Sequence, residues 1–346
     1  MTDTRQRFLI VRLSSIGDIV HTLPAVSALG RTFSTAEIHW AVERRHALLL
    51  GGNPYIHRVI EFDTLGWRKR LTQAATLREV GDGLRALRSC HYDAAIDFQG
   101  LWKSSVVAWL SGARERIGFE KAWLREPGAA LLYTQRVSPG ERKHVIEMNL
   151  SLVERLGAQA QPWEFPLPRT DRDDAVVETL LKARNMKDFI VVNPGGGWRS
   201  KCWSPENYAG LIRQLQDICN ERIVLTGSPD EEDQIGAILD RAGPRRAAYL
   251  PTSLIQFIAL VRRAKLFIGG DTGPLHLAAA AGTPIVGIYG PTDPARNGPF
   301  RPDDIALTNQ SPINHTRRGA NPEYLPGISV ESVVAAVMQR LARAHG

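Results

Sequence analysis

The sequence predicts an α/β protein made of two Rossmann-like domains, each a parallel β-sheet covered by helices. Three observations support this fold class. The chain of 346 residues is too long for one small domain. Short β-rich runs alternate with longer amphipathic stretches along its whole length. A proline-rich segment, residues 159–169, separates two similar halves, and its three prolines cannot continue a helix or a central strand.

The elements follow in order from the periodicity of the apolar residues. Strands are predicted at Phe8–Leu13, Glu37–Val42, Arg58–Phe62, Ala94–Phe98, Phe189–Asn193, Arg222–Thr226, Leu266–Gly269 and Ile285–Tyr289. Apolar residues at helical spacing predict helices at Thr76–Arg88, Asn207–Cys219 and Val330–Ala344. We place the domain boundary in the proline-rich segment, which gives an N-terminal domain of residues 1–168 and a C-terminal domain of residues 169–346.

Composition and charge exclude several classes of protein. No apolar stretch approaches the roughly 20 residues that span a bilayer, and no secretory leader is evident. The three cysteines lie far apart without metal-ligand spacing, so we expect no disulfide framework and no zinc site in a soluble protein of a reducing compartment. Residues 1–170 hold 23 basic and 17 acidic side chains, against 20 and 19 in residues 171–346. An anionic partner is therefore expected on the first half, although a merely basic, solvated surface would have the same composition.

The first motif is the turn after the first strand, Ser14-Ser-Ile-Gly-Asp18, which leads into a helix expected from about Ile19. Strand ends of an open α/β sheet face the ligand crevice. Asp18 is therefore either the N-cap of the following helix or a general base at the crevice. Ser15 and Gly17 either bind an anion or simply form the turn.

The second motif is Asp271-Thr-Gly-Pro-Leu-His276, again between a strand and a helix. The amides of Thr272, Gly273, Leu275 and His276 are predicted to point from the helix N-terminus at a phosphate group, where the helix dipole favours negative charge. Asp271 suits a sugar hydroxyl or a cap. His276 is either a ligand contact or a packing residue.

The third motif is the glycine-rich loop Gly195-Gly196-Gly197 with Lys201. Because Ser200 stands where the third glycine of a dinucleotide fingerprint would fall, the loop is not that fingerprint. Its glycines would let backbone approach a ligand, and Lys201 either neutralises a diphosphate or is an ordinary solvated lysine. Two acidic residues also follow strands of this half: Glu231, which suits ribose hydroxyls or a helix first turn, and Asp293.

The first half also supplies basic groups suited to carboxylates or phosphates. They are Arg68, Lys69, Lys103 and Arg125. Residues 101–110 read either as a partly interfacial helix or as a core helix. Asp171-Arg-Asp173 matches an acidic metal-binding pattern, but we place it in the linker and expect no metal site.

Taken in order, these motifs resemble the ADP-heptose:lipopolysaccharide heptosyltransferases of glycosyltransferase family 9, over essentially the whole chain. The match includes His21-Thr-Leu-Pro24 and Tyr289-Gly-Pro-Thr-Asp293-Pro. Gln99-Gly-Leu-Trp-Lys103-Ser and Arg125-Glu-Pro resemble the branch called heptosyltransferase I, whereas Asn193-Pro-Gly-Gly-Gly is closer to heptosyltransferase II.

The resemblance implies a GT-B fold, with two Rossmann-like domains facing each other across a cleft, and metal-independent inverting transfer without a cofactor. The donor, ADP-L-glycero-D-manno-heptose, would bind the C-terminal domain, and the Kdo of Kdo2-lipid A the N-terminal domain. Asp18 would be the base, Lys201 and residues 272–276 would neutralise the diphosphate, Glu231 would bind the ribose and Asp271 the heptose. Further donor contacts are expected at Gly196, Gly197 and Asp293. Acceptor contacts are expected at Ser15, Gly17, Arg68, Lys69, Lys103 and Arg125.

The resemblance also implies a cytoplasmic enzyme, peripheral on the inner membrane, whose last helix packs back on the N-terminal domain. Three alternatives stay open: transfer to an already heptosylated core by a heptosyltransferase II, nicotinamide-dependent oxidation, and non-catalytic anion binding. The missing third glycine counts against the oxidoreductase. No platform of basic and aromatic residues predicts a nucleic-acid partner.

Overall fold

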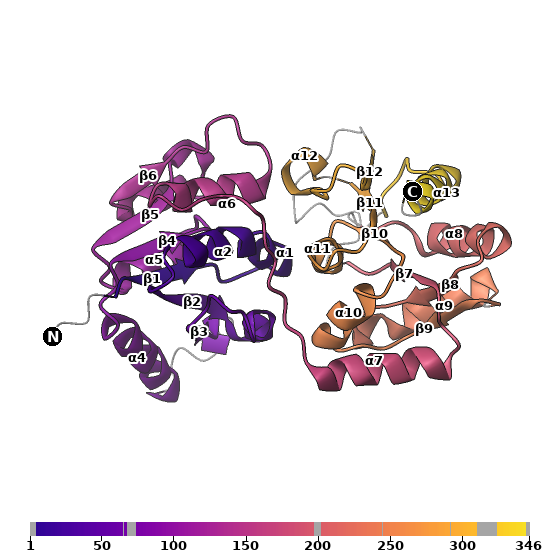
Figure 1. The fold of residues 1–346 in the computed structure, drawn as a ribbon, viewed down its shortest axis with the longest axis horizontal. Helices are drawn as coiled ribbons and strands as arrows, with labels where there is room; N and C mark the ends of the chain where they lie inside the picture. The colour runs from indigo at the N-terminus through magenta and orange to yellow at the C-terminus, as the bar shows by residue number, and fades with distance from the viewer. Residues whose placement is uncertain are drawn as a thin grey trace. The chain divides into compact units, whose positions relative to one another are not determined.

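The computed structural model describes residues 5–64, 66–67, 74–196, 202–243, 245–290, 292–309 and 324–343. The chain divides into two compact units, residues 1–168 and 169–346. Each unit contains one six-stranded sheet whose strands all pair in parallel. Helices cover both sheets, which confirms the α/β class and the two Rossmann-like halves (Figure 1).

The sheet of the first unit has the strand order β3-β2-β1-β4-β5-β6. Its strands are β1 Arg7–Val11, β2 Glu37–Glu43, β3 Arg58–Phe62, β4 Ala94–Asp97, β5 Glu115–Phe119 and β6 Gln135–Val137. Its helices, with 3-10 helices marked η, are α1 Ile16–Val20, α2 Leu23–Thr32, η1 Arg44–Leu50, α4 Ala74–Arg88, α5 Trp102–Leu110, η2 Lys121–Trp123, η3 Pro127–Leu132 and α6 Val145–Glu154.

The second unit repeats this topology in the order β12-β11-β10-β7-β8-β9. Its strands are β7 Phe189–Asn193, β8 Arg222–Leu225, β9 Ala247–Tyr249, β10 Leu266–Gly270, β11 Ile285–Tyr289 and β12 Ile305–Thr308. Its helices are α7 Asp171–Ala183, α8 Pro205–Ile218, η5 Pro229–Glu231, α9 Glu232–Ala242, α10 Leu254–Val261, α11 Gly273–Ala280, α12 Pro294–Asn297 and α13 Val330–Arg343.

All eight predicted strands are present, with ends that differ by one or two residues at most. Strands β5, β6, β9 and β12 were not predicted from the sequence. Three of them, β6, β9 and β12, lie at sheet edges and are three or four residues long. Short strands at an edge bury little side-chain surface, so they carry little hydrophobic pattern to detect.

Two local expectations were wrong. Helix α1 begins at Ile16 rather than near Ile19, because Ser15 is its N-cap residue. Asp171 and Asp173 do not lie in the linker; they occupy the first turn of α7 after the N-cap Thr170, whose side chain accepts a hydrogen bond from the Asp173 amide. Acidic residues there interact favourably with the helix dipole, which explains the acidic pattern without a metal.

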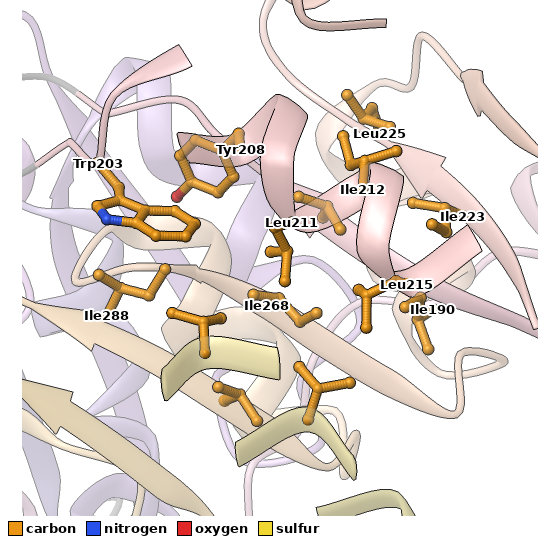
Figure 2. Packing of buried hydrophobic residues seen from close by; sticks show 14 of the residues in the cluster. Ile190, Trp203, Tyr208, Leu211, Ile212, Leu215, Ile223, Leu225, Ile268 and Ile288 are labelled. Atoms are coloured by element: carbon orange, nitrogen blue, oxygen red, sulfur yellow. The ribbon is translucent and has the colours of Figure 1, made fainter. Parts of the chain in front are cut away.

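A hydrophobic core of buried residues lies within the second unit (Figure 2). Trp203, Tyr208 and Leu211 pack there with Ile268 and other strand residues of the sheet. Helix α13 adds its apolar face to the same cluster and contacts α8, β10, β11 and β12. The apolar face of this helix is therefore buried in the second unit, and packing of the helix on the first half stays a prediction.

The strand order places one switch point in each unit. In a doubly wound sheet the chain turns to opposite sides after the two central strands, and ligands bind beyond their carboxyl ends. These strands are β1 and β4 in the first unit, and β7 and β10 in the second. The loops that follow them carry the motifs selected from the sequence.

Candidate functional site

Asp18 lies at the switch point of the first unit, on the third residue of α1. Its carboxylate accepts hydrogen bonds from the Ser15 amide (3.0 Å) and the Ser15 hydroxyl (2.9 Å) and forms an ion pair with Arg12. Asp18 therefore belongs to the capping box of α1, with Ser15 as the N-cap itself. Because 41% of its side-chain surface stays exposed, the cap leaves the carboxylate open to a ligand.

Arg12 lowers the pKa of the Asp18 carboxyl group and so favours its ionised form. Burial by itself would raise the pKa of Asp18, but the Arg12 charge and the Ser15 hydrogen bonds outweigh it and hold the pKa below its ordinary value of 3.8. The Arg12 guanidinium is buried and also donates to the Phe98 carbonyl at the end of β4. Sequence reasoning missed Arg12, although a basic residue at the end of an apolar strand was the available signal.

Asp97, at the end of β4, is the central acceptor of a buried hydrogen-bond network. Its carboxylate is fully buried and accepts from the Tyr133 hydroxyl (2.7 Å), the Ser104 hydroxyl (2.8 Å) and the amides of Gln99 (2.9 Å) and Gly100 (3.2 Å). Burial raises the pKa of Asp97, and these hydrogen bonds oppose the rise. The Gln99 side chain in turn accepts from the Leu13 amide at 2.9 Å. The network therefore fixes the loop after β4 against the loop after β1.

The basic residues predicted to bind an acceptor are only partly described. Lys103 is the second residue of α5 and lies close enough to His46 of η1 to affect its charge. Burial, and then the charges of Arg45 and Lys103, lower the pKa of His46 to about 4, so this imidazole is neutral at pH 7. Arg125 is exposed between η2 and η3. Arg68 and Lys69 lie outside the described residues.

In the second unit, the glycine loop after β7 is held close to two other segments. A Cβ added to Gly195 would lie 2.2 Å from Glu231 Oε1, and one added to Gly196 would lie 2.7 Å from Cys202 Sγ and 3.2 Å from Thr272 Cγ2. A side chain at Gly195 would have to displace the Glu231 carboxylate, and one at Gly196 would have to displace the shorter Cys202 side chain. The fold thus brings Glu231 and Thr272 to the loop, as one ligand site requires. Gly197 and Lys201 lie outside the described residues.

Asp271 lies at the end of β10 with both carboxylate oxygens engaged. Oδ1 is 3.0 Å from His276 Nε2, and Oδ2 accepts from the Thr292 hydroxyl at 2.6 Å. His276 is therefore buried against Asp271 from the first turn of α11. Thr292 was not predicted as a site residue, although its place in the motif after β11 offered a signal.

One expectation about the amides of the donor site needs correction. The amides of Leu275 and His276 donate to the Thr272 carbonyl, at 3.1 and 3.4 Å, as ordinary helix hydrogen bonds. Among the four amides expected to bind phosphate, only those of Thr272 and Gly273 lack a hydrogen bond within the described part of the chain. Asp293 is the N-cap of α12, where its side chain accepts from the Ala295 amide at 2.9 Å, and its role in donor binding stays a prediction.

No group of three or more His, Cys, Asp or Glu side chains in the described ranges is arranged to hold a metal ion. No helix among them is long and apolar enough to cross a membrane.

These two switch points belong to a known class of enzyme. The model of glycosyltransferase family 9 (heptosyltransferase) matches residues 82–324, so the chain belongs to this family of glycosyltransferases. The lipopolysaccharide heptosyltransferase 1 of Pseudomonas aeruginosa is 31% identical over 312 residues, covering 88% of this chain and 84% of the relative. The enzyme of that name from Escherichia coli K12 is 30% identical over 298 residues, covering 85% and 91%.

Solved structures agree on the fold. The E. coli heptosyltransferase WaaC with ADP superposes with a TM-score of 0.77 and 27% identity, covering 97% of this chain and 100% of WaaC. The E. coli ADP-heptose lipopolysaccharide heptosyltransferase II gives a TM-score of 0.74 at 22% identity, covering 99% and 100%. The chain therefore has the GT-B fold of these enzymes.

Proposed function

We propose that this enzyme transfers a heptosyl group from ADP-L-glycero-D-manno-heptose to the Kdo of Kdo2-lipid A in the lipopolysaccharide inner core. The observation that carries this proposal is the similarity to two enzymes named lipopolysaccharide heptosyltransferase 1, each over more than four fifths of both chains. Donor chemistry is supported by the WaaC structures, which contain ADP or an ADP-2-deoxy-2-fluoro heptose.

Asp18 is the proposed general base. The carboxylate is ionised at neutral pH, since its pKa lies below the ordinary value of 3.8. Its exposed surface leaves it open to an acceptor hydroxyl. The carboxylate takes the hydroxyl proton while the acceptor oxygen forms a bond to C1 of the heptose. The bond from C1 to the diphosphate breaks on the opposite face, and its electron pair leaves with ADP, which inverts the configuration at C1.

The second unit is the proposed donor site. Gly196, with Gly197 beyond the described residues, lets the backbone approach the nucleotide, and Glu231 beside the loop suits ribose hydroxyls. Lys201 and the start of α11, at Thr272 and Gly273, would stabilise the leaving diphosphate, so that transfer needs no metal. Asp271 would orient the heptose, with His276 and Thr292 holding its carboxylate in place.

The first unit is the proposed acceptor site. Lys103 and Arg125, with Arg68 and Lys69 beyond the described residues, would bind the acidic groups of the acceptor, beside Ser15 and Gly17 at the start of α1. The excess of basic over acidic residues in the first half supports this assignment. A lipid-linked acceptor requires the enzyme to work at a membrane surface, and we propose the cytoplasmic face of the inner membrane.

The test is ADP release from ADP-heptose, with and without Kdo2-lipid A, in excess EDTA. We expect release that depends on the acceptor and is insensitive to EDTA. Release only with an already heptosylated core would transfer the assignment to the heptosyltransferase II reaction. If ADP-heptose does not bind by calorimetry, the donor assignment itself is wrong.

A further inference from the structure

One face of the first unit exposes large apolar side chains that the proposed chemistry does not use. Trp109 of α5 keeps 51% of its surface exposed, and Leu131 of η3 keeps 74%. Trp102 of α5 and Trp123 of η2 are also exposed. Scattered exposed apolar residues are normal in proteins, but a group of them indicates an interaction surface. In the described ranges, every tryptophan classed as exposed lies on this face.

These four side chains, here called the aromatic patch, lie on elements that pack together. Helix α5 contacts η3, and η3 contacts η2. Trp102 packs over Gly128, where an added Cβ would lie 2.3 Å from its ring. Trp109 is seven residues further along α5, which places it on the same side of the helix about 10 Å away. The aromatic patch is therefore a single surface region rather than four separate residues.

The side chains around the aromatic patch are mainly basic. Residues 102–136, which contain it, hold six Lys and Arg against three Asp and Glu. Lys121 and Arg125 are exposed on either side of Trp123. Arg136, also exposed, donates from Nε to the Ala130 carbonyl of η3 at 3.0 Å. One of the acids, Glu126, already accepts a hydrogen bond from the Trp102 amide at 2.7 Å.

We propose that the aromatic patch docks on an anionic lipid bilayer. Tryptophan is favoured at the boundary between headgroups and acyl chains because its ring is apolar and its N–H remains hydrated. Lysine and arginine beside it are attracted by anionic headgroups. A second copy of the chain fits less well, since a two-fold interface would bring this patch and its basic residues against themselves.

The position of the patch connects it with the proposed acceptor site. Helix α5 starts at the carboxyl end of β4, only a few residues after Asp97 and Gln99, and η2 follows β5 at the same edge of the sheet. Docking there would hold this edge at the lipid surface from which a lipid-linked acceptor is taken. The link between docking and the supply of acceptor rests on the proposed function, whereas binding of the aromatic patch to a bilayer does not.

The experiment is co-sedimentation of the full chain with vesicles of phosphatidylethanolamine and phosphatidylglycerol that contain no acceptor. We expect binding that weakens with added salt and is poor on phosphatidylcholine alone. The double variant Trp109→Ser and Leu131→Ser should bind at least about tenfold more weakly. Ile218→Ser is the matched control, because Ile218 of the second unit is also 51% exposed and lies outside the patch. Circular dichroism checks that both variants fold.

Three outcomes would overturn the proposal: wild-type protein that stays in the supernatant, a double variant that sediments like the wild type, or a control that loses binding equally. A wild-type dimer that the double variant converts to monomer, without any vesicle binding, would make the patch an interface between copies instead. Turnover separates this proposal from the proposed function. The double variant should lose rate on vesicle-embedded acceptor and keep it on an acceptor stripped of its acyl chains. Absence of ADP release with either acceptor would count against the proposed function only.

Discussion

The two switch points use the same strand order but hold their loops in different ways. In the first unit, charged and polar side chains fix the loops after β1 and β4. Arg12 forms an ion pair with Asp18 and donates to the Phe98 carbonyl. Asp97 accepts four hydrogen bonds. In the second unit, His276 and Thr292 also hold the Asp271 carboxylate, and in addition the loops after β7 and β10 approach each other at Gly196 and Thr272.

Under the proposed function, this difference matches the different tasks of the two sites. A general base needs a carboxylate with a fixed direction and a controlled charge, which a network of donors provides. A nucleotide needs close access to backbone amides, which glycine favours because it has no side chain. The following predictions test this contrast, from the largest expected effect to the smallest.

The first prediction removes the charge of Asp18. Asp18→Asn keeps an oxygen that can accept from the Ser15 amide, so α1 should stay capped, but it cannot take a proton. We expect kcat to fall about 10²–10⁴-fold, the usual contribution of a general base. ADP release measures the rate, and thermal unfolding checks stability. Near-normal turnover would leave Asp18 with its capping role alone.

The second prediction breaks the buried network of the first unit. Asp97→Ala leaves the Tyr133 hydroxyl and the amides of Gln99 and Gly100 without their acceptor. The Ser104 hydroxyl keeps only the Leu101 carbonyl as an acceptor. We therefore expect a loss of about 3–5 kcal/mol in the free energy of unfolding. Tyr133→Phe removes a single donor and should cost about 1–2 kcal/mol. Urea unfolding measures both variants. Equal losses in the two would contradict the role of Asp97 as the centre of the network.

The third prediction concerns the buried carboxylate of the second unit. Thr292→Val removes the hydroxyl that donates to Asp271 Oδ2 while keeping the shape of the side chain. If Asp271 orients the donor sugar, KM for ADP-heptose should rise about tenfold with a smaller change in kcat. Thr179→Val is a matched control, because Thr179 is an exposed residue of α7. A KM that stays at the wild-type value would remove the Thr292–Asp271 pair from donor binding.

The fourth prediction concerns the pH profile. Arg12→Met removes the positive charge that lowers the pKa of Asp18, while the burial that raises it remains. The pKa of Asp18 should therefore rise, and the acid limb of kcat/KM should move to higher pH. Arg12→Lys, which keeps the charge, should leave the limb closer to the wild-type position. An acid limb that is the same in all three proteins would show that Arg12 does not set the charge of Asp18.

The fold was predictable to the extent that its strands are buried. All five residues of β7 and of β11 are buried, and the sequence predicts both strands from their unbroken apolar runs. Strand β9 has only three residues, two of them partly exposed, and was missed. Helix α13 was predicted from its periodicity, but periodicity cannot identify the surface that its apolar face meets.

The site was predictable residue by residue but not as a set of contacts. Asp18 and Asp271 were selected because acidic residues after strands lie at the ligand edge of the sheet. Arg12, Asp97 and Thr292 were missed as site residues. For Arg12 and Thr292 a local signal was available, whereas the partners of Asp97 include one that is distant in the sequence. Asp97 is 36 residues from Tyr133, whose hydroxyl it binds.

By itself, then, the sequence determined the alternation of strands and helices, the two halves and the motifs that follow the central strands. These features depend on local propensity and on patterns within a few residues. The tertiary structure alone decided which helix face is buried where, which carboxylates are held by distant donors and which tryptophans stay exposed. Those outcomes depend on burial and on contacts between segments far apart in the chain. The reason is that the surrounding atoms set the energy of a hydrogen bond and the pKa of a charged group.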